Sequence, residues 1–392
     1  MWVFWTLSIV PILVWLALWA RHKEVVLWEA AISAGVALLT ALVFQLLAVF
    51  GMTSDIETWS GQITHVTHHP RWVEEYQQAH TRTVGSGKDA RTETYYTTEH
   101  RTHPEHWTAD TSVEVTHQIT ETFFNQARVK FKDYTTETPW KVGFYSGDRN
   151  IYVSYNRGVY CYPVTRIARW QNKIKAAPSV FSFAKVPTNV LVYAWPENDN
   201  WLESDRLLGT AKNIVSLTEF DRMNARLGPS KKVNVIMVGF VNEGPESGQY
   251  QQAKWVGGKK NDLVICFGGA SGSKKPEWAY VFGWTDKEIV KQNLQTIVLN
   301  EGVSTKVLPK IEEEIRRSYV IKDWTKFDYI TIEPPTWSYI VYVVVVGVVQ
   351  TILFFVFSSN SIAKYGYDFA RETVRRSTSY AGRQFNSGWT RR

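Results

Sequence analysis

Three long apolar segments constrain how this chain can fold. They cover residues 1–20, 25–52 and 337–357. As helices, all three are long enough to cross a hydrocarbon layer of roughly 30 Å. Aromatic side chains such as Trp19 and Trp337 stand at their ends, as is typical where a helix meets the interface between lipid and water. We therefore expect three transmembrane helices.

Basic residues flank these segments on one side. Arg21 and Lys23 separate the first two segments, and the tail after Phe357 holds seven Lys or Arg residues against two acidic ones. Because loops rich in Lys and Arg stay in the cytoplasm, both stretches are predicted to be cytoplasmic. Residues 53–336 are then predicted to lie on the opposite side, in a multi-pass membrane protein.

The basic tail, residues 358–392, carries most of the net charge of +7. Anionic lipid headgroups attract such a tail, so the lipid bilayer is favoured as its partner over nucleic acid. Arg alternates with aromatic residues there, which also suits stacking on single-stranded nucleic acid. The residues predicted to contact lipid are Lys364, Arg371, Arg375, Arg376 and Arg383.

Residues 53–185 are rich in Thr, Tyr, His and Glu, and polar and apolar residues alternate in short stretches. Examples are Ser112–Gln118, Arg128–Lys132 and Asn150–Tyr155. Alternation with a period of two is typical of strands with one buried face. We expect a β-rich, histidine-containing domain outside the cytoplasm.

The pattern changes in residues 186–330. Val233–Phe240, Leu263–Phe267 and Trp278–Trp284 are continuous apolar runs. Such runs indicate strands that are covered on both faces, and Cys266 is expected to be a buried free thiol in the second run. Alternation of these strands with helices predicts an α/β/α sandwich.

Capping boxes predict where two helices of this region begin. One is Ser216–Glu219, with Gly228-Pro229 as the predicted stop, and the other is Thr285–Glu288. In the second helix Ile289, Leu294 and Ile297 are predicted to face inward. A third helix is predicted from the apolar stripe Leu308, Ile311, Ile315 and Tyr319.

The run Lys231–Phe240 (KKVNVIMVGF) and the segment Tyr250–Asp262 (YQQAKWVGGKKND), which leads into LVICF, resemble a TPM domain over about 190–325. TPM domains are membrane-anchored α/β/α domains that face a lumen or periplasm. A broader resemblance, through strings around Asp55–Gly61 and Gly85–Asp89, is to uncharacterised membrane proteins of tailed bacteriophages. Together they imply an α+β membrane protein of the bacterial inner membrane, with its main part periplasmic and its tail cytoplasmic.

Eight of the nine histidines lie between residues 65 and 117. The spacing of His100, His103 and His106, with His68 or His69 as a fourth ligand, suits a divalent metal such as zinc. In the bacteriophage proteins that the chain resembles, the region that corresponds to residues 65–100 is rich in cysteines. This chain has none there, which argues against a shared thiolate site, but histidine is a reasonable replacement ligand. Surface histidines without a metal, or a cluster that responds to pH, are the alternatives.

The TPM resemblance also implies metal-dependent phosphatase activity, which some members of that family have been proposed to carry. Such chemistry needs clustered carboxylates that hold a cation and a nucleophilic water. The candidates are Asp262, Asp286 and Glu301, although the first two are also explained as turn and helix-start residues. The loop Gly268–Ser273 follows a predicted strand, and ligands of open α/β sheets bind at such strand ends.

Two glycine-rich stretches resemble anion-binding loops. Gly85–Lys88 lacks the full spacing of a phosphate-binding loop and is expected to be a turn. Gly257–Lys260 is expected to end a helix before the strand that follows. Neither stretch therefore predicts a nucleotide site.

The function expected from the sequence is that of a membrane-anchored, non-enzymatic interaction or scaffold protein, with another protein or a second copy of itself as partner. One alternative is a metal-dependent phosphohydrolase of TPM type. Another is an envelope protein that excludes competing bacteriophages. A divalent metal is the one cofactor that the sequence suggests.

Overall fold

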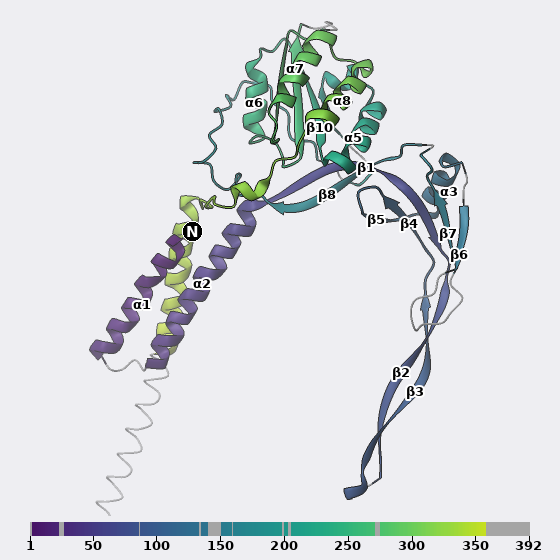
Figure 1. Ribbon diagram of the computed structural model, residues 1–392. Helices are drawn as coiled ribbons and strands as arrows, with labels where there is room; N and C mark the ends of the chain where they lie inside the picture. Colours follow the sequence, from purple (N-terminus) through teal and green to yellow (C-terminus); the bar gives the residue numbers. More distant parts are fainter. Residues whose placement is uncertain are drawn as a thin grey trace, which may run out of the picture. The chain divides into compact units, whose positions relative to one another are not determined.

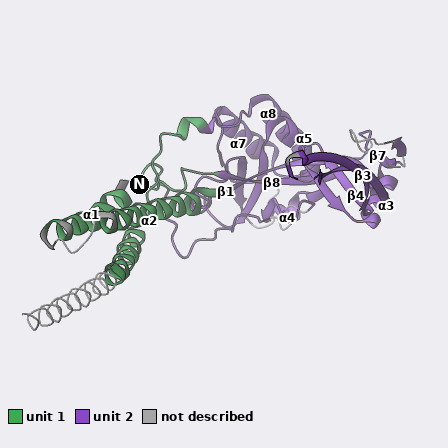
Figure 2. Ribbon diagram, turned by 90° about the horizontal axis from the view of Figure 1, so that it is seen from below, with its two compact units in different colours: residues 1–54, 171–182, 325–392 green, residues 55–170, 183–324 purple. Residues whose placement is uncertain are grey.

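The computed structural model describes residues 2–22, 27–85, 87–132, 135–139, 150–158, 160–197, 200–202, 205–270 and 275–357 (Figure 1). The chain is mixed α+β and divides into two compact units. Unit 1 comprises residues 1–54, 171–182 and 325–392, and unit 2 comprises residues 55–170 and 183–324 (Figure 2). The basic tail with its predicted lipid-contacting residues lies outside the described residues.

Unit 1 contains three apolar helices where the sequence predicted them. They are α1 (Trp2–His22), α2 (Leu27–Thr53) and the C-terminal helix Thr336–Phe357. Two of the described helices, over Glu29–Thr53 and Thr336–Phe357, are long and apolar enough to cross a membrane. The apolar part of α1, Val3–Leu18, is shorter.

Polar side chains of unit 1 meet between the helices. Trp15 Nε1 donates a hydrogen bond to Gln350 Oε1 over 2.9 Å, and the Ser33 hydroxyl donates to the same oxygen. The hydroxyls of Ser8 and Tyr342 are hydrogen-bonded and buried. The outer surface of the helices is apolar instead. Its exposed side chains include Leu13, Leu39, Leu47, Phe50, Val344 and Phe355.

The first part of unit 2 is a six-stranded sheet with the strand order β5-β4-β1-β7-β6, in which β8 pairs with β1. Helix α3 (Glu121–Lys130) packs on it through Phe124 and Ala127. The strands are β1 (Ser54–His69), β4 (His106–Thr111), β5 (Thr116–Ile119), β6 (Thr135–Pro139), β7 (Asn150–Tyr155) and β8 (Pro163–Gln171).

One of the three strands predicted in this region is confirmed, as β7. Ser112–Gln118 instead turns at Glu114, whose φ is 60°, before β5 begins. Arg128–Lys132 forms the end of α3 and the residues after it. A helix forms there in place of a strand because Thr120 caps its start and because Phe124 and Ala127, three residues apart, face the same core.

Strands β2 (Trp72–Val84) and β3 (Arg91–His103) form a separate two-stranded antiparallel ribbon (Figure 1). They pair over their whole length, from Trp72 opposite His103 to Val84 opposite Arg91. The predicted turn at Gly85–Asp89 connects them, and Gly85 takes a φ of 94° that favours glycine. We call these residues the β2–β3 ribbon.

The second sheet of unit 2 has the strand order β12-β11-β10-β9, and all three predicted apolar strands are confirmed in it. Strands β9, β10 and β11 are parallel, while β12 is antiparallel to β11. The bounds are β9 (Leu207–Gly209), β10 (Asn234–Val241), β11 (Asp262–Gly269) and β12 (Trp278–Gly283).

Both faces of this sheet are covered. Helices α5 (Leu217–Lys231), α7 (Ile289–Glu301) and α8 (Leu308–Ser318) cover one face (Figure 1). The short helix α6 (Glu246–Lys254) and an extended segment with Tyr193 cover the other. The second layer is thus thinner than that of the predicted sandwich. Cys266 is buried in β11 and free, as expected.

The helix starts and faces differ in part from the prediction. Helix α5 begins after Ser216 but continues past Gly228-Pro229 to Lys231. Gly228 therefore does not end the helix. It allows α5 and β1 to approach closely, because a Cβ at this position would lie 1.7 Å from the backbone oxygen of Ser60 in β1. The predicted stripe of α8 is confirmed, and its members are all buried.

Helix α7 begins at Ile289, later than its predicted capping box. The Thr285 hydroxyl donates to the Val320 carbonyl over 2.8 Å instead of capping the helix. The buried face is Val290, Leu294 and Val298, whereas Ile289 is exposed and Ile297 is partly buried. Of the three residues predicted to face inward, Leu294 is fully buried.

Candidate functional site

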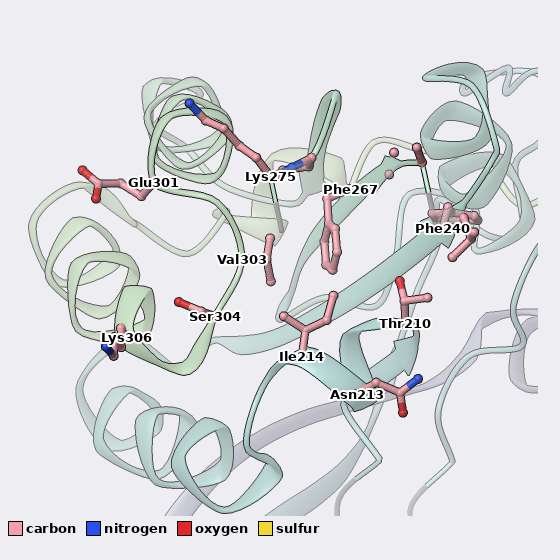
Figure 3. Close-up of a pocket in the computed structure, with 15 residues that line it drawn as sticks. Thr210, Asn213, Ile214, Phe240, Phe267, Lys275, Glu301, Val303, Ser304 and Lys306 are labelled. Carbon is pink, nitrogen blue, oxygen red and sulfur yellow. The ribbon is translucent and has the colours of Figure 1, made fainter. Parts of the chain in front are cut away.

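A pocket of about 660 Å³ lies at the carboxyl ends of β10 and β11, where the sequence predicted one (Figure 3). Its walls come from the residues after β9, from the ends of the two strands, and from the segment that follows α7. The loop Gly268–Ser273 contributes Gly268, Gly269 and Ala270, and its later residues lie outside the described part of the chain.

The middle of the pocket is apolar and its rim is charged. Phe267, Ile214 and Val303 gather in the middle, while the Glu301 carboxylate points away from them (Figure 3). Glu301 Oε1 instead accepts from Lys310 Nζ at 2.8 Å. Lys275 and Lys306 also line the pocket. This arrangement suits a small ligand with an apolar body and a polar end, and Glu301, the acidic residue among the described lining residues, already pairs with a lysine.

The structure does not bring the three predicted catalytic carboxylates together. Asp262 is buried at the amino end of β11, opposite to the pocket edge of that strand. Asp286 pairs with Lys322 at 3.1 Å, and Glu301 pairs with Lys310. Among the described residues, no group of three or more His, Cys, Asp or Glu side chains is placed to hold a metal.

Asp262 belongs to a buried hydrogen-bond network. Its carboxylate accepts from Asn234 Nδ2, from Trp195 Nε1 and from the Lys259 backbone N–H, each over 2.8 Å. Burial raises the pKa of Asp262, and these hydrogen bonds oppose the rise. A buried carboxylate with both oxygens engaged in this way is explained by its place in the fold.

Arg206 extends the network and was missed by the sequence reasoning. It is buried, and its Nε donates to Asn234 Oδ1 over 2.5 Å while one terminal nitrogen donates to Thr165 Oγ1 over 3.0 Å. Burial lowers its pKa to about 10, and the charges of Asp221 and Asp262 oppose that change. The sequence signal was a charged residue directly before the apolar start of β9.

The glycine turn after α6 forms as predicted, and its lysines are engaged. Gly257 and Gly258 take φ values of 83° and 89° between the helix and β11. The Lys259 amine contacts the Asp55 carboxylate, and Lys260 Nζ lies 2.7 Å from Glu57 Oε2. These ion pairs connect the turn to β1, so both lysines already have anionic partners.

The four histidines of the predicted metal site have separate partners. His68 Nε2 lies 2.6 Å from a Glu105 oxygen, and His106 stacks on His69 with ring centroids 4.4 Å apart. His103 pairs with Glu74 at 2.6 Å, whereas His100 lies 3.8 Å from Glu75. The cause is the strand itself: residues three apart in β3 point to opposite faces, so this spacing separates His100 from His103.

The β2–β3 ribbon is a second candidate site, of the kind that binds another protein. Its side chains mainly contact one another. Trp72 stacks on His103 at 4.5 Å, and Arg101 lies over the Tyr76 ring at 5.4 Å. Tyr96 is 66% exposed. The sequence predicted a β-rich region and a turn here but did not place these two strands, whose run of Thr, Tyr, His and Glu on both sides of Gly85–Asp89 was the available signal.

No family model matches the chain, and no curated protein or solved structure matches it either. The resemblance to TPM domains and to bacteriophage membrane proteins therefore stays a prediction.

Proposed function

We propose that this protein is a membrane-anchored, non-enzymatic interaction or scaffold protein. The observation that carries the proposal is the construction of unit 1, whose polar side chains meet between helices while its large apolar side chains point outward. Leu47 and Phe355, for example, are 64% and 67% exposed, whereas Ser8 and Tyr342 are buried. This distribution is unfavourable in water, where each exposed Å² of apolar surface costs about 25 cal/mol, and it is favourable in lipid.

Helix α1 is included in the proposed membrane domain although its apolar part is shorter. Its Ser8 and Trp15 side chains bond to Tyr342 and Gln350 of the C-terminal helix. With three spans, the basic flanks of the apolar segments favour an orientation in which unit 2 lies outside the cytoplasm. The resemblance stated above suggests the periplasmic face of a bacterial inner membrane, a TPM-like α/β domain, and a bacteriophage origin.

Interaction is favoured over phosphohydrolase chemistry by the placement of the acidic residues. Asp262, Asp286 and Glu301 lie apart, and each has its own partner. The β2–β3 ribbon supports an interaction role, because a long polar ribbon whose edges pair with no other described strand is suited to binding another chain. Exclusion of competing bacteriophages is one role that such a protein can serve.

Protease protection in membrane vesicles tests the proposed anchoring and orientation. The full chain, with an epitope at its carboxyl end, is placed in sealed inverted vesicles, and trypsin is added outside. We expect removal of the epitope and protection of a large fragment that contains unit 2. Digestion of unit 2 with survival of the epitope, or release of the chain by alkaline carbonate, contradicts the proposal.

The enzyme alternative is tested on the detergent-purified full chain with a generic phosphomonoester, with and without divalent metal. We expect no metal-stimulated turnover. Turnover that is stimulated by metal and lost in Asp262→Asn, in protein that stays folded, overturns the non-enzymatic function.

A further inference from the structure

The β2–β3 ribbon leaves one edge of each strand without a strand partner among the described residues. Each strand of the ribbon pairs only with the other, over 13 residues. An isolated two-stranded ribbon is marginally stable in water, and an unpaired edge presents a row of N–H and C=O groups to another strand. Strand β3 contains no proline to block that edge.

One acidic and one basic residue of β3 are placed symmetrically about its centre. Thr97 is the middle residue of Arg91–His103. Glu93 lies four residues before Thr97, and Arg101 lies four residues after it. Two copies of β3 that run antiparallel with Thr97 opposite Thr97 therefore place each Glu93 opposite an Arg101. Such opposite-charge pairs stabilise antiparallel strands.

Neighbouring registers lack this match. A shift that moves the centre from Thr97 to Tyr96 places Arg91 opposite Arg101 and Glu93 opposite Glu99. Like charges directly opposite each other destabilise a strand pair. A shift of the centre to Thr98 places Glu93 opposite His103 and loses the pair with Arg101.

Both strands carry exposed charges, and the burial of Glu74 is what favours the β3 edge. In β2, Glu75 and Arg82 are exposed, whereas Glu74 is buried and bound to His103. In β3, Glu93 pairs with Arg82 and Arg91 of its own ribbon and keeps 34% of its side chain exposed, and Arg101 is exposed beside the Tyr76 ring.

We propose that β3 of one chain pairs antiparallel with β3 of a second copy, centred on Thr97, so that the two ribbons form one four-stranded sheet. The inference rests on the proposed interaction function and names its partner. The two-fold axis passes through the Thr97 pair, and Tyr95 of each copy lies opposite Glu99 of the other.

Cysteine crosslinking tests the register. Opposite residues of antiparallel strands have Cα atoms about 4.5–5.5 Å apart, which a disulfide can span. The full chain in detergent carries Thr97→Cys in a Cys161→Ser background, since Cys266 is buried. We expect a covalent dimer on mild oxidation. The matched control is Thr92→Cys, because position 92 lies opposite position 102 and the two introduced thiols are about 34 Å apart.

Charge exchange tests the pairing itself. Glu93→Arg, made together with Arg82→Glu so that the pair across its own ribbon is kept, should reduce the Thr97→Cys crosslink about tenfold, because two attractive pairs between the copies become repulsive. Glu75→Arg, which changes a charge on β2, should leave the crosslink unchanged.

Equal crosslinking at positions 92 and 97, or a crosslink that is unchanged by the charge exchange at position 93, overturns the self-pairing. So does crosslinking of Thr97→Cys to a different protein in place of a second copy. Extraction with alkaline carbonate is measured on the same sample. If the chain resists extraction but does not crosslink, only the self-pairing is contradicted. If the chain is extracted but crosslinks, only the proposed membrane anchoring is contradicted.

Discussion

The Asn234 side-chain amide donates a hydrogen bond to the Asp262 carboxylate over 2.8 Å, between residues that are directly opposite in strands β10 and β11. The amide oxygen of Asn234 accepts from Arg206 Nε over 2.5 Å. One amide thus connects a buried guanidinium to a buried carboxylate. Asp262 therefore contributes to the stability of unit 2.

Asp262→Asn should therefore destabilise the protein, because an amide has one acceptor oxygen where the carboxylate accepts three hydrogen bonds, and because the buried Arg206 keeps, among the described residues, only Asp221 as a nearby anion. Loss of one partner of a buried charged network costs about 3 kcal/mol. The measurement is thermal unfolding of the detergent-purified chain, followed by tryptophan fluorescence. Asp286→Asn is the control, because its ion pair with Lys322 is partly exposed and its loss should cost less than about 1 kcal/mol. Equal effects of the two substitutions on thermal unfolding would contradict this role of Asp262.

Gly228→Ala should destabilise unit 2 by about 2 kcal/mol or more, because the new Cβ would meet the Ser60 backbone oxygen at 1.7 Å. Relief requires α5 to move away from β1. The same unfolding measurement reports the change. Gly51→Ala in α2 is the matched control, since a Cβ there has no neighbour within 4 Å. A neutral Gly228→Ala would show that α5 and β1 are not in close contact.

Gln350→Leu should weaken the packing of unit 1, because the Gln350 amide accepts from Trp15 and donates to the Ser33 carbonyl over 3.2 Å. Hydrogen bonds between membrane helices contribute about 1 kcal/mol each. The measurement is the temperature at which the detergent-solubilised chain loses its monodisperse elution peak. Phe355→Leu, on the exposed apolar surface, should leave that temperature unchanged. An unchanged Gln350→Leu protein argues against the observed packing of these helices.

Glu312 should make stability depend on acid pH. Burial alone would raise the pKa of Glu312, but hydrogen bonds from Arg226 and Arg316 outweigh burial and lower it. A carboxylate whose folded pKa is lowered stabilises the fold above its unfolded pKa, near 4.5, and this contribution is lost as the pH falls through the folded pKa. Glu312→Gln should therefore cost about 1–2 kcal/mol at pH 7 and much less near pH 3.

The check is a comparison of thermal midpoints of the two proteins across that pH range. Glu313→Gln, at an exposed neighbouring position of α8, serves as the control and should show no such trend. A difference between Glu312→Gln and the parent that is the same at pH 3 and pH 7 would contradict the assignment.

Removal of metal should leave the thermal midpoint unchanged. His68 and His103 lie at hydrogen-bond distance from carboxylates, and His100 lies near Glu75. The untagged chain is dialysed against a chelator, and its metal content and unfolding are measured. Stoichiometric zinc that stabilises the chain, and that is lost in His100→Ala or His103→Ala, would restore the predicted metal site.

The sequence alone determined the features that depend on residues close together in the chain. The apolar runs of β10, β11 and β12 need no partner to be recognised as buried strands, and the stripe of α8 repeats at the helical period. The length and apolarity of α2 and of the C-terminal helix are likewise written in consecutive residues. The same holds for the pocket's position, which follows from a glycine-rich loop after a parallel strand.

Tertiary structure decided whatever depends on residues distant in the chain. Gly228 reads as a helix stop, yet its role is set by Ser60 of β1, which it approaches closely. His100 and His103 read as ligands, yet the strand turns them to opposite faces. Asp262 reads as catalytic or as a turn residue, yet Asn234, Trp195 and Lys259 engage its carboxylate. The spacing of residues along the chain does not by itself predict which side chains meet, because the fold decides the direction in which each side chain points.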